Sequence, residues 1–144
     1  MILAGAWKVT RAFIPKMIEA RNGGAITLIS SAMGAQPQPG GVAYTTAKHG
    51  ILGLMRTLSW ELSACNIRAN AVSPGGVDTE IIDGDTHARG HERFPRFFTT
   101  QRSLVPMDWL AEQDIANAVY FLSSDRAINI TGLNLPVDAG WTNF

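Results

Sequence analysis

The strongest hydrophobic pattern in the chain runs from residue 42 to residue 64, where apolar side chains recur at steps of three and four. This spacing places them on one face and predicts an amphipathic helix over the whole segment. The apolar positions of that face are Ala47, Ile51, Leu54, Met55, Leu58 and Leu62. The same steps predict a second helix over residues 3–20, with apolar positions at Ala6, Val9, Phe13, Met17 and Ala20.

Local signals shape these elements and add a third helix. Pro15 lacks an amide proton, so we expect it to distort the helix over residues 3–20 locally. The glycines of RNGG, residues 21–24, are expected to cap the end of that helix. A third helix is predicted over residues 112–124, because acidic residues crowd its first turn. Four apolar residues share a face of it: Ile115, Ala118, Val119 and Leu122.

Three short apolar runs predict strands. AITLIS, residues 25–30, is an unbroken run typical of a strand buried on both faces, and NIRANAVSP, residues 66–74, predicts a second buried strand. In GLNLPVDAG, residues 132–140, apolar positions alternate, which predicts a last strand. Pro136 has no amide to donate, so this strand is expected at a sheet edge or with one bond missing.

The remaining segments are predicted to be loops. SAMGAQPQPGG, residues 31–41, is rich in Gly and Pro. Residues 80–108 have no clear period and mix charges, prolines and aromatic residues, which favours a lid or binding loop. Helices and strands therefore alternate along the chain, which predicts an α/β fold with a parallel sheet covered by helices on both faces. In such sheets ligands bind beyond the carboxyl ends of the strands, so active groups are expected just after residues 30, 72 and 137.

Composition narrows the class of protein. The 144 residues are 46% hydrophobic, as in a single globular domain, and Lys plus Arg equals Asp plus Glu at 12 each. This balance gives no reason to expect nucleic acid or an anionic membrane as a partner. Cys65 is the only cysteine, so no disulfide framework is expected, and a reduced, cytoplasmic, soluble protein is predicted. His87 and His91 have helical ligand spacing, but the glycine-broken segment offers no third ligand, so no metal site is expected.

Candidate chemistry gathers at the predicted strand ends. Tyr44 and Lys48 lie four residues apart at the start of the helix over 42–64, so they share a face. Such a pair is often an ordinary helix-surface pair. An ammonium near a phenol, however, favours the tyrosinate form and makes Tyr44 a candidate general acid or base. Ser31 follows the first strand, and its hydroxyl could bond a substrate oxygen. Together these groups fit proton transfer at a carbonyl or alcohol.

The spacing of these residues resembles the short-chain dehydrogenase/reductase family. The family pattern is a Ser, twelve residues, a Tyr, three residues and a Lys, which Ser31, Tyr44 and Lys48 match, whereas Ser30 is one residue off. NAVSPGGVDT is similar to the family's Pro-Gly segment with its Thr, and SSDRAINITGLNLPVDAG resembles its C-terminal strand. The segments GAWKVTRAFIPKMI, KHGILGLMRTL, NAVYFLSSD and LPVDAG also resemble the mycofactocin-coupled subgroup, which includes carveol dehydrogenase-like enzymes.

The resemblance implies roles for individual residues. Tyr44 would donate or accept the proton, Lys48 would favour ionised Tyr44 and bond the nicotinamide ribose, and Ser31 would hold the substrate oxygen. The nicotinamide pocket would be lined by Pro74, Gly75 and Val77, with Thr79 reaching the cofactor. NAD or NADP is the implied cofactor, with NAD favoured, and the implied reaction is hydride transfer between it and an alcohol or ketone. The apolar residues within 80–108 suggest a hydrophobic, terpenoid-like substrate.

The sequence departs from the family in three places. No Thr-Gly-x-x-x-Gly-x-Gly turn occurs in it, so residues 1–144 resemble the C-terminal half of a Rossmann-type, NAD(P)-binding domain. Ile2 stands where the family has the Asn of its proton relay, and Ala139 stands where many members have Gly. Because a sheet cut in the middle exposes an apolar strand edge, self-association is expected. The resemblance implies a homo-oligomer, a dimer or tetramer, joined through residues 3–20, 42–64 and the last strand.

Two other functions stay open at this point. The chain could be a truncated, non-catalytic remnant that serves only in assembly or interaction, since the Gly-rich turn does not occur in it. It could instead be an epimerase or dehydratase of the extended family, which also uses Tyr-x-x-x-Lys. SPGGVDT and the short C-terminus favour the dehydrogenase type over the extended one.

Overall fold

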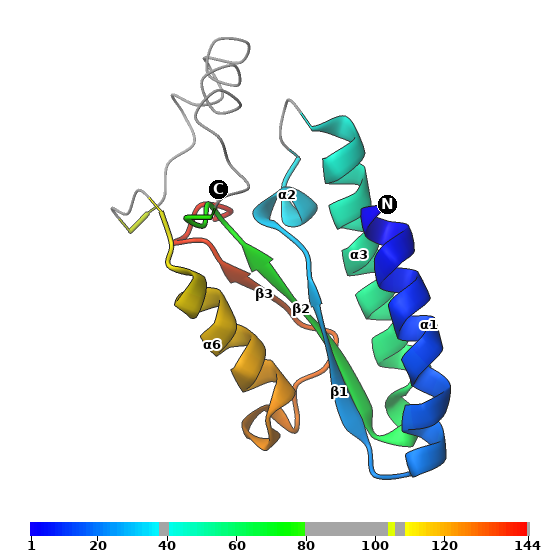
Figure 1. Ribbon diagram of the computed structural model, residues 1–144. Coiled ribbons are helices and arrows are strands. Elements are labelled where there is room, and N and C mark those ends of the chain that lie inside the picture. The colour runs from blue at the N-terminus through cyan, green and yellow to red at the C-terminus, as the bar shows by residue number, and fades with distance from the viewer. Residues whose placement is uncertain (38–40, 80–103, 106–108, 144) are drawn as a thin grey trace.

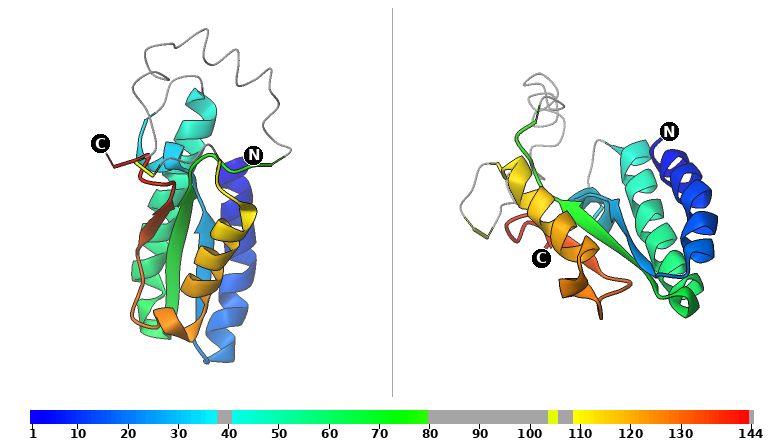
Figure 2. Two further views of the ribbon diagram at one scale, coloured as in Figure 1. Left: turned by 90° about the vertical axis from the view of Figure 1, so that its left-hand side faces the viewer. Right: turned by 60° about the horizontal axis from the view of Figure 1, so that its bottom comes forward.

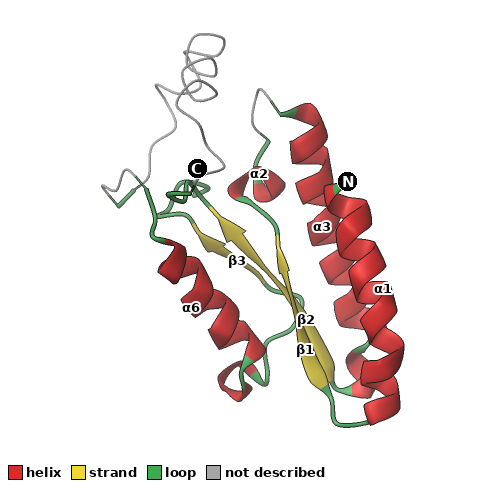
Figure 3. Cartoon of the chain, in the orientation of Figure 1, coloured by secondary structure: helices red, strands yellow, loops and turns green. Residues whose placement is uncertain are grey.

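Three parallel strands form the centre of the protein, as the computed structural model of residues 1–37, 41–79, 104–105 and 109–143 describes it (Figures 1 and 3). They are β1 (Gly24–Ile29), β2 (Ile67–Pro74) and β3 (Asn134–Val137), in the order β1-β2-β3. Gly24 pairs with Ile67 at the start of the first ladder, and Ala71 pairs with Asn134 in the second. The predicted α/β fold with a parallel sheet is confirmed.

Helices cover both faces of this sheet. α1 (Ile2–Ala20) and α3 (Val42–Glu61) lie on one side, and α6 (Glu112–Ser123) lies on the other, as the right-hand view of Figure 2 shows. Short 3₁₀ turns at Ser63–Cys65 and Asp125–Ala127 follow α3 and α6. None of the helices in the described ranges is long and apolar enough to cross a membrane.

The two predicted buried strands differ in how deeply they lie. β2 is the central strand, and its residues pack toward α3 on one face and toward α6 on the other. β1 is an edge strand among the described residues, and its inner positions are only half-buried, with Ile29 43% exposed. The expectation that β1 is buried on both faces is therefore wrong for this structure. β3 forms the other edge, where Pro136 was predicted to lie.

The packing of α1 also differs from the predicted stripe. Val9 and Phe13 are 58% and 59% exposed, whereas Ile14 and Met17 pack onto the core between α3 and β2. α1 is apolar around most of its circumference, so its inward face cannot be identified from spacing alone. The helix runs through Pro15, and its left-handed cap residue is Arg21 (φ 53°) rather than a glycine.

A short helix, α2 (Ala32–Ala35), occupies part of the segment that was predicted to be a loop. The Ser31 hydroxyl caps it by accepting the amide proton of Met33 at 3.2 Å. Gly34 lies tightly against α3, since a Cβ there would come within 2.9 Å of the Lys48 carbonyl oxygen. A helix of one turn has no period to detect, which is why the Gly and Pro content dominated the prediction.

Two polar side chains of β2 bond the end of α6 and the segment between α6 and β3. The Arg68 guanidinium donates to the carbonyls of Leu122 (2.8 Å), Ser124 (3.1 Å) and Ile130 (3.3 Å). Carbonyls at the end of a helix lack intrahelical partners, so Arg68 satisfies groups that α6 cannot satisfy itself. The Asn70 side chain, 1% exposed, donates to the Ile130 carbonyl and accepts from the amide of Leu133, just before β3.

Replacing Arg68 tests this anchoring. We expect Arg68→Met to lower the free energy of unfolding by roughly 2–3 kcal/mol, because carbonyls at the end of α6 lose a charged donor. Urea denaturation followed by circular dichroism measures the loss. Arg56→Met, which removes an exposed arginine of α3, serves as the control and should change stability by less than about 0.5 kcal/mol. Equal effects of the two substitutions would contradict the anchoring role.

Candidate active site

The carboxyl ends of the three strands meet at one end of the sheet, next to α2 and the C-terminus (Figure 1). The strands end at Ile29, Pro74 and Val137, close to the predicted positions 30, 72 and 137. Ser31, the glycines at 75 and 76, and the last residues of the chain therefore come together, as parallel pairing requires.

The start of α3 brings Tyr44 and Lys48 to this end of the sheet. The ammonium nitrogen of Lys48 lies 5.5 Å from the centroid of the Tyr44 ring. It also donates to the Ile29 carbonyl at 3.0 Å, so the last residue of β1 holds it in place. Partial burial lowers the pKa of the Lys48 ammonium, because the charged form loses hydration. Tyr44 remains 39% exposed and accessible to a ligand.

Two adjacent serines after β1 have different surroundings. Ser30 is 2% exposed, and its hydroxyl donates to the Lys48 carbonyl at 3.0 Å, so it joins β1 to α3. Ser31 is less buried, and its oxygen accepts from the Met33 amide. A hydroxyl can accept and donate at once, so the Ser31 proton can still be given to a ligand. Ser31 is therefore the more exposed of the two serines, and its role in holding a substrate stays a prediction.

The segment after β2 contains the other predicted site residues. Val77 is fixed by a parallel bridge to Leu110, and Thr79 is the last described residue before the gap. A Cβ at Gly75 would lie 2.9 Å from the Asp138 Cα. A Cβ at Gly76 would lie 3.1 Å from the Trp109 ring. Internal packing therefore explains why glycine occupies both positions, whether or not a nicotinamide binds here. The roles of Pro74, Gly75, Val77 and Thr79 at the cofactor stay predictions.

Sequence reasoning missed several residues that build this end of the sheet. Asp138, 6% exposed, follows β3 and bonds the residues after it. Gln36, at the end of α2, donates to the Thr142 carbonyl at 2.9 Å. An isolated aspartate and an isolated glutamine have no spacing signal, and only their contacts across the fold reveal them.

Other sequence expectations fall partly outside the described residues. His87 and His91 lie there, as does most of the predicted lid over 80–108, apart from Leu104 and Val105. Within the described ranges, no group of three or more His, Cys, Asp or Glu side chains is arranged to hold a metal ion. The Trp109 ring, which follows the predicted lid, packs against Gly76.

Comparison with known proteins identifies a family model and several relatives that match this chain. A family model described as "Enoyl-(Acyl carrier protein) reductase" matches residues 2–142. An uncharacterised oxidoreductase of Mycobacterium tuberculosis is 40% identical over 98% of this chain and 54% of its own length. The (-)-trans-carveol dehydrogenase of Rhodococcus erythropolis is 36% identical over 97% of this chain and 53% of its own length.

A solved structure also matches. The short chain dehydrogenase of Mycobacterium paratuberculosis bound to NAD superimposes with a TM-score of 0.95 at 35% identity, over 100% of this chain and 54% of that one. The chain spans about half the length of the curated relatives it matches. With the parallel sheet, the Ser31, Tyr44 and Lys48 spacing and a family match over residues 2–142, the chain belongs to the short-chain dehydrogenase/reductase family, corresponding to the C-terminal half of its members.

Proposed function

We propose that this chain provides the catalytic half of an NAD(P)-dependent oxidoreductase that interconverts an alcohol and a ketone. The observation that carries the proposal is the Lys48 ammonium, which lies 5.5 Å from the centroid of the Tyr44 ring and is bonded to the Ile29 carbonyl at the end of β1. A carveol dehydrogenase among the relatives supports an alcohol substrate, and the hydrophobic class predicted from residues 80–108 fits it.

Tyr44 acts as the general acid or base at its hydroxyl. In the oxidation direction, ionised Tyr44 takes the proton of the substrate hydroxyl, and in reduction it returns a proton to the carbonyl oxygen. The bond of Lys48 to the Ile29 carbonyl keeps its positive charge near the Tyr44 ring. Ser31 donates its hydroxyl proton to the same substrate oxygen and so orients the carbon that exchanges hydride.

The donors in this site fit a nicotinamide cofactor. An ammonium and a phenol at the strand ends suit the hydroxyl groups of a ribose, so Lys48 and Tyr44 would hold that sugar. Pro74, Gly75, Val77 and Thr79 would lie toward the nicotinamide. When bound, NAD(P) accepts or supplies the hydride. The NAD-bound relative supports NAD as the first cofactor to test, with NADP as the second.

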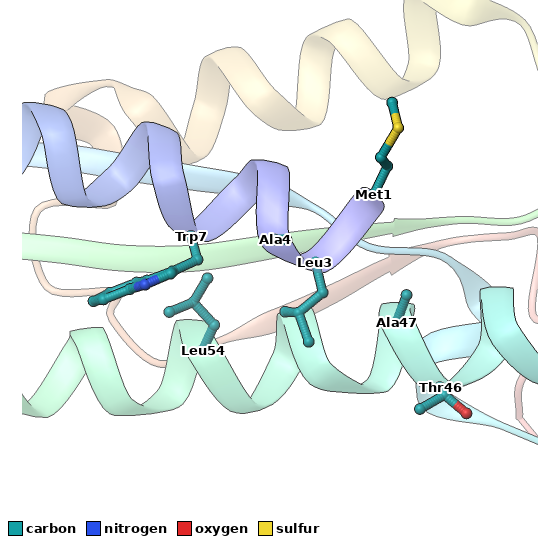
Figure 4. Close-up of a pocket in the computed structure, with 7 residues that line it drawn as sticks. All are labelled: Met1, Leu3, Ala4, Trp7, Thr46, Ala47 and Leu54. Atoms are coloured by element: carbon teal, nitrogen blue, oxygen red, sulfur yellow. The ribbon is translucent and has the colours of Figure 1, made fainter.

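Assembly is part of the proposal. An apolar groove runs between α1 and α3 (Figure 4). It is lined by Met1, by Leu3, Ala4 and Trp7 of α1, and by Thr46, Ala47 and Leu54 of α3. Glycines inside α1 and α3 add to the argument, because a Cβ at Gly5 or Gly53 would have nothing within 4 Å. A glycine inside a helix costs about 1 kcal/mol relative to alanine, and no contact among the described residues requires glycine at these two positions. A second copy that packs closely on this side accounts for both features.

A purely structural role is the second candidate. The exposed apolar side chains of α1, among them Trp7, Val9 and Phe13, would serve an assembly protein without any chemistry. Cofactor binding separates the two functions, since only the oxidoreductase needs Lys48 and Tyr44 to contact a nicotinamide ribose. Titration of the chain with NADH and NADPH, followed by nicotinamide fluorescence, is the direct test.

Tyr44→Phe tests the mechanism. We expect alcohol oxidation to fall at least about 100-fold, because the proton acceptor is lost. NADH should still bind, although more weakly, because Lys48 keeps its contact with the ribose while the Tyr44 hydroxyl is lost. The matched control is Tyr120→Phe, which removes the hydroxyl of an exposed tyrosine on α6 and should leave the rate unchanged. A Tyr44→Phe variant with full oxidation activity would refute the assignment, and no saturable binding at millimolar cofactor would refute independent activity of the chain.

The Lys48 ammonium gives a prediction in pH. Its titration midpoint, followed by NMR of the lysine side-chain carbon, should lie below the ordinary 10.5 because burial lowers its pKa. The unfolded chain then binds more protons between the two pKa values, so this group's contribution to the free energy of unfolding rises as pH increases through that interval. Lys48→Met should lack this rise. A midpoint at or above 10.5 would contradict the desolvated environment.

Gly53→Leu tests the assembly surface. In the part of the chain that the structure describes, nothing lies within 4 Å of a Cβ at this position, so the variant should be at least as stable as the parent chain. The assembled mass should fall toward that of a monomer. Sedimentation velocity measures the mass, and urea denaturation measures the stability. Ala116→Leu, on α6 across the sheet, is the control and should not change the mass. An unchanged mass for Gly53→Leu, or a monomeric parent chain, would refute this surface.

A further inference from the structure

A single buried carboxylate organises the end of the chain, residues 138–143, which we call the C-terminal turn. One oxygen of Asp138 accepts the Gly140 amide at 3.0 Å. The other accepts the Thr142 amide at 2.9 Å and the Thr142 hydroxyl. Within the turn, Ala139 (φ 53°) and Gly140 (φ 81°) both adopt the left-handed conformation. This conformation is unfavourable for alanine, so the carboxylate's bonds hold a backbone shape that the chain would not keep unaided.

The C-terminal turn contacts three segments that surround the candidate active site. Its Thr142 carbonyl accepts from the Gln36 side chain at 2.9 Å. Its Ala139 carbonyl accepts from the Val105 amide at 3.0 Å. Immediately before the turn, the Gly75 amide donates to the Val137 carbonyl at 2.9 Å, and Gly75 itself packs against Asp138. The turn therefore connects the segments that follow β1 and β2 with the one that precedes α6.

The contact with Gln36 leads directly to Ser31. These two residues cap the opposite ends of α2, which is a single helical turn. The middle of α2 is held as well, because Gly34 packs against the Ser30 hydroxyl and the Lys48 carbonyl. Ser31 is thus placed relative to Lys48 by α2, and α2 is fixed at its far end by the C-terminal turn.

We propose that Asp138 is a positioning residue for Ser31, acting through Thr142, Gln36 and α2. Its carboxylate keeps the Thr142 carbonyl where Gln36 can donate to it. The held end of α2 in turn fixes the Ser31 hydroxyl at the opposite end of that helix, which packs against Lys48 through Gly34. The catalytic consequence of this placement rests on the proposed function, whereas the placement itself does not.

Hydrogen exchange followed by NMR tests the placement without any turnover. In Asp138→Asn, and in Gln36→Glu, which cannot donate to Thr142, the Met33 amide should exchange about tenfold faster or more. Amides of β2 should exchange as in the parent chain, which separates local release of α2 from a general loss of stability. Asp125→Asn, an exposed isosteric change, is the matched control and should alter neither.

Two exchange results would overturn the placement. One is an unchanged Met33 amide in both variants. The other is acceleration of the Met33 and β2 amides by the same factor in both variants, which would mean that Asp138 only stabilises the fold.

Kinetics tests the catalytic consequence. Asp138→Asn should lower kcat about 10- to 100-fold with the NADH dissociation constant unchanged. In a Ser31→Ala background, Asp138→Asn should have little further effect on kcat, because the Ser31 hydroxyl that Asp138 positions has already been removed. Full additivity would overturn the route through Ser31. A parent chain without turnover would refute the proposed function of the isolated chain, and the exchange experiment would still decide the placement.

Discussion

Two hydrogen bonds between the end of β1 and a single lysine hold the site together. The Ser30 hydroxyl donates to the Lys48 carbonyl, and the Lys48 ammonium donates back to the Ile29 carbonyl. The Ser30 amide also donates to Val72 of β2 at 2.8 Å. β1, β2 and α3 are therefore joined at Ser30, and the Lys48 ammonium is fixed relative to the sheet. Buried polar groups need partners, so these bonds leave α3 little freedom to rotate.

This arrangement explains what the sequence could predict. The positions of β1 and β2 follow from unbroken apolar runs, and that of α3 follows from its helical period. Parallel pairing then brings the ends of the strands together. Tyr44 and Lys48 share a face because they lie four residues apart on a helix. The spacing to Tyr44 and Lys48 selected Ser31 rather than Ser30 as the candidate site residue. In the structure Ser30 is buried and bonded to Lys48, whereas Ser31 is less enclosed.

The features that the sequence did not predict depend on contacts between distant segments. α2 exists because Ser31 caps it and Gly34 fits against Lys48, and neither condition is a periodic signal. The exposure of Phe13 could not be predicted, because α1 is apolar on several sides. Asp138 is one acidic residue in a strand-end motif, and its importance comes from what it bonds after the chain has folded.

The bonds from Arg68 and Asn70 have a consequence for the order of folding. Their acceptors lie between residues 122 and 130, more than fifty positions away along the chain. The end of α6 therefore obtains its donors only after β2 has docked beside it. Contacts so distant in sequence form late and slowly, since the entropy of closing the loop must be overcome first. We therefore expect α6 and β3 to dock together, in one cooperative step, onto a unit of β1, α3 and β2 that has already formed.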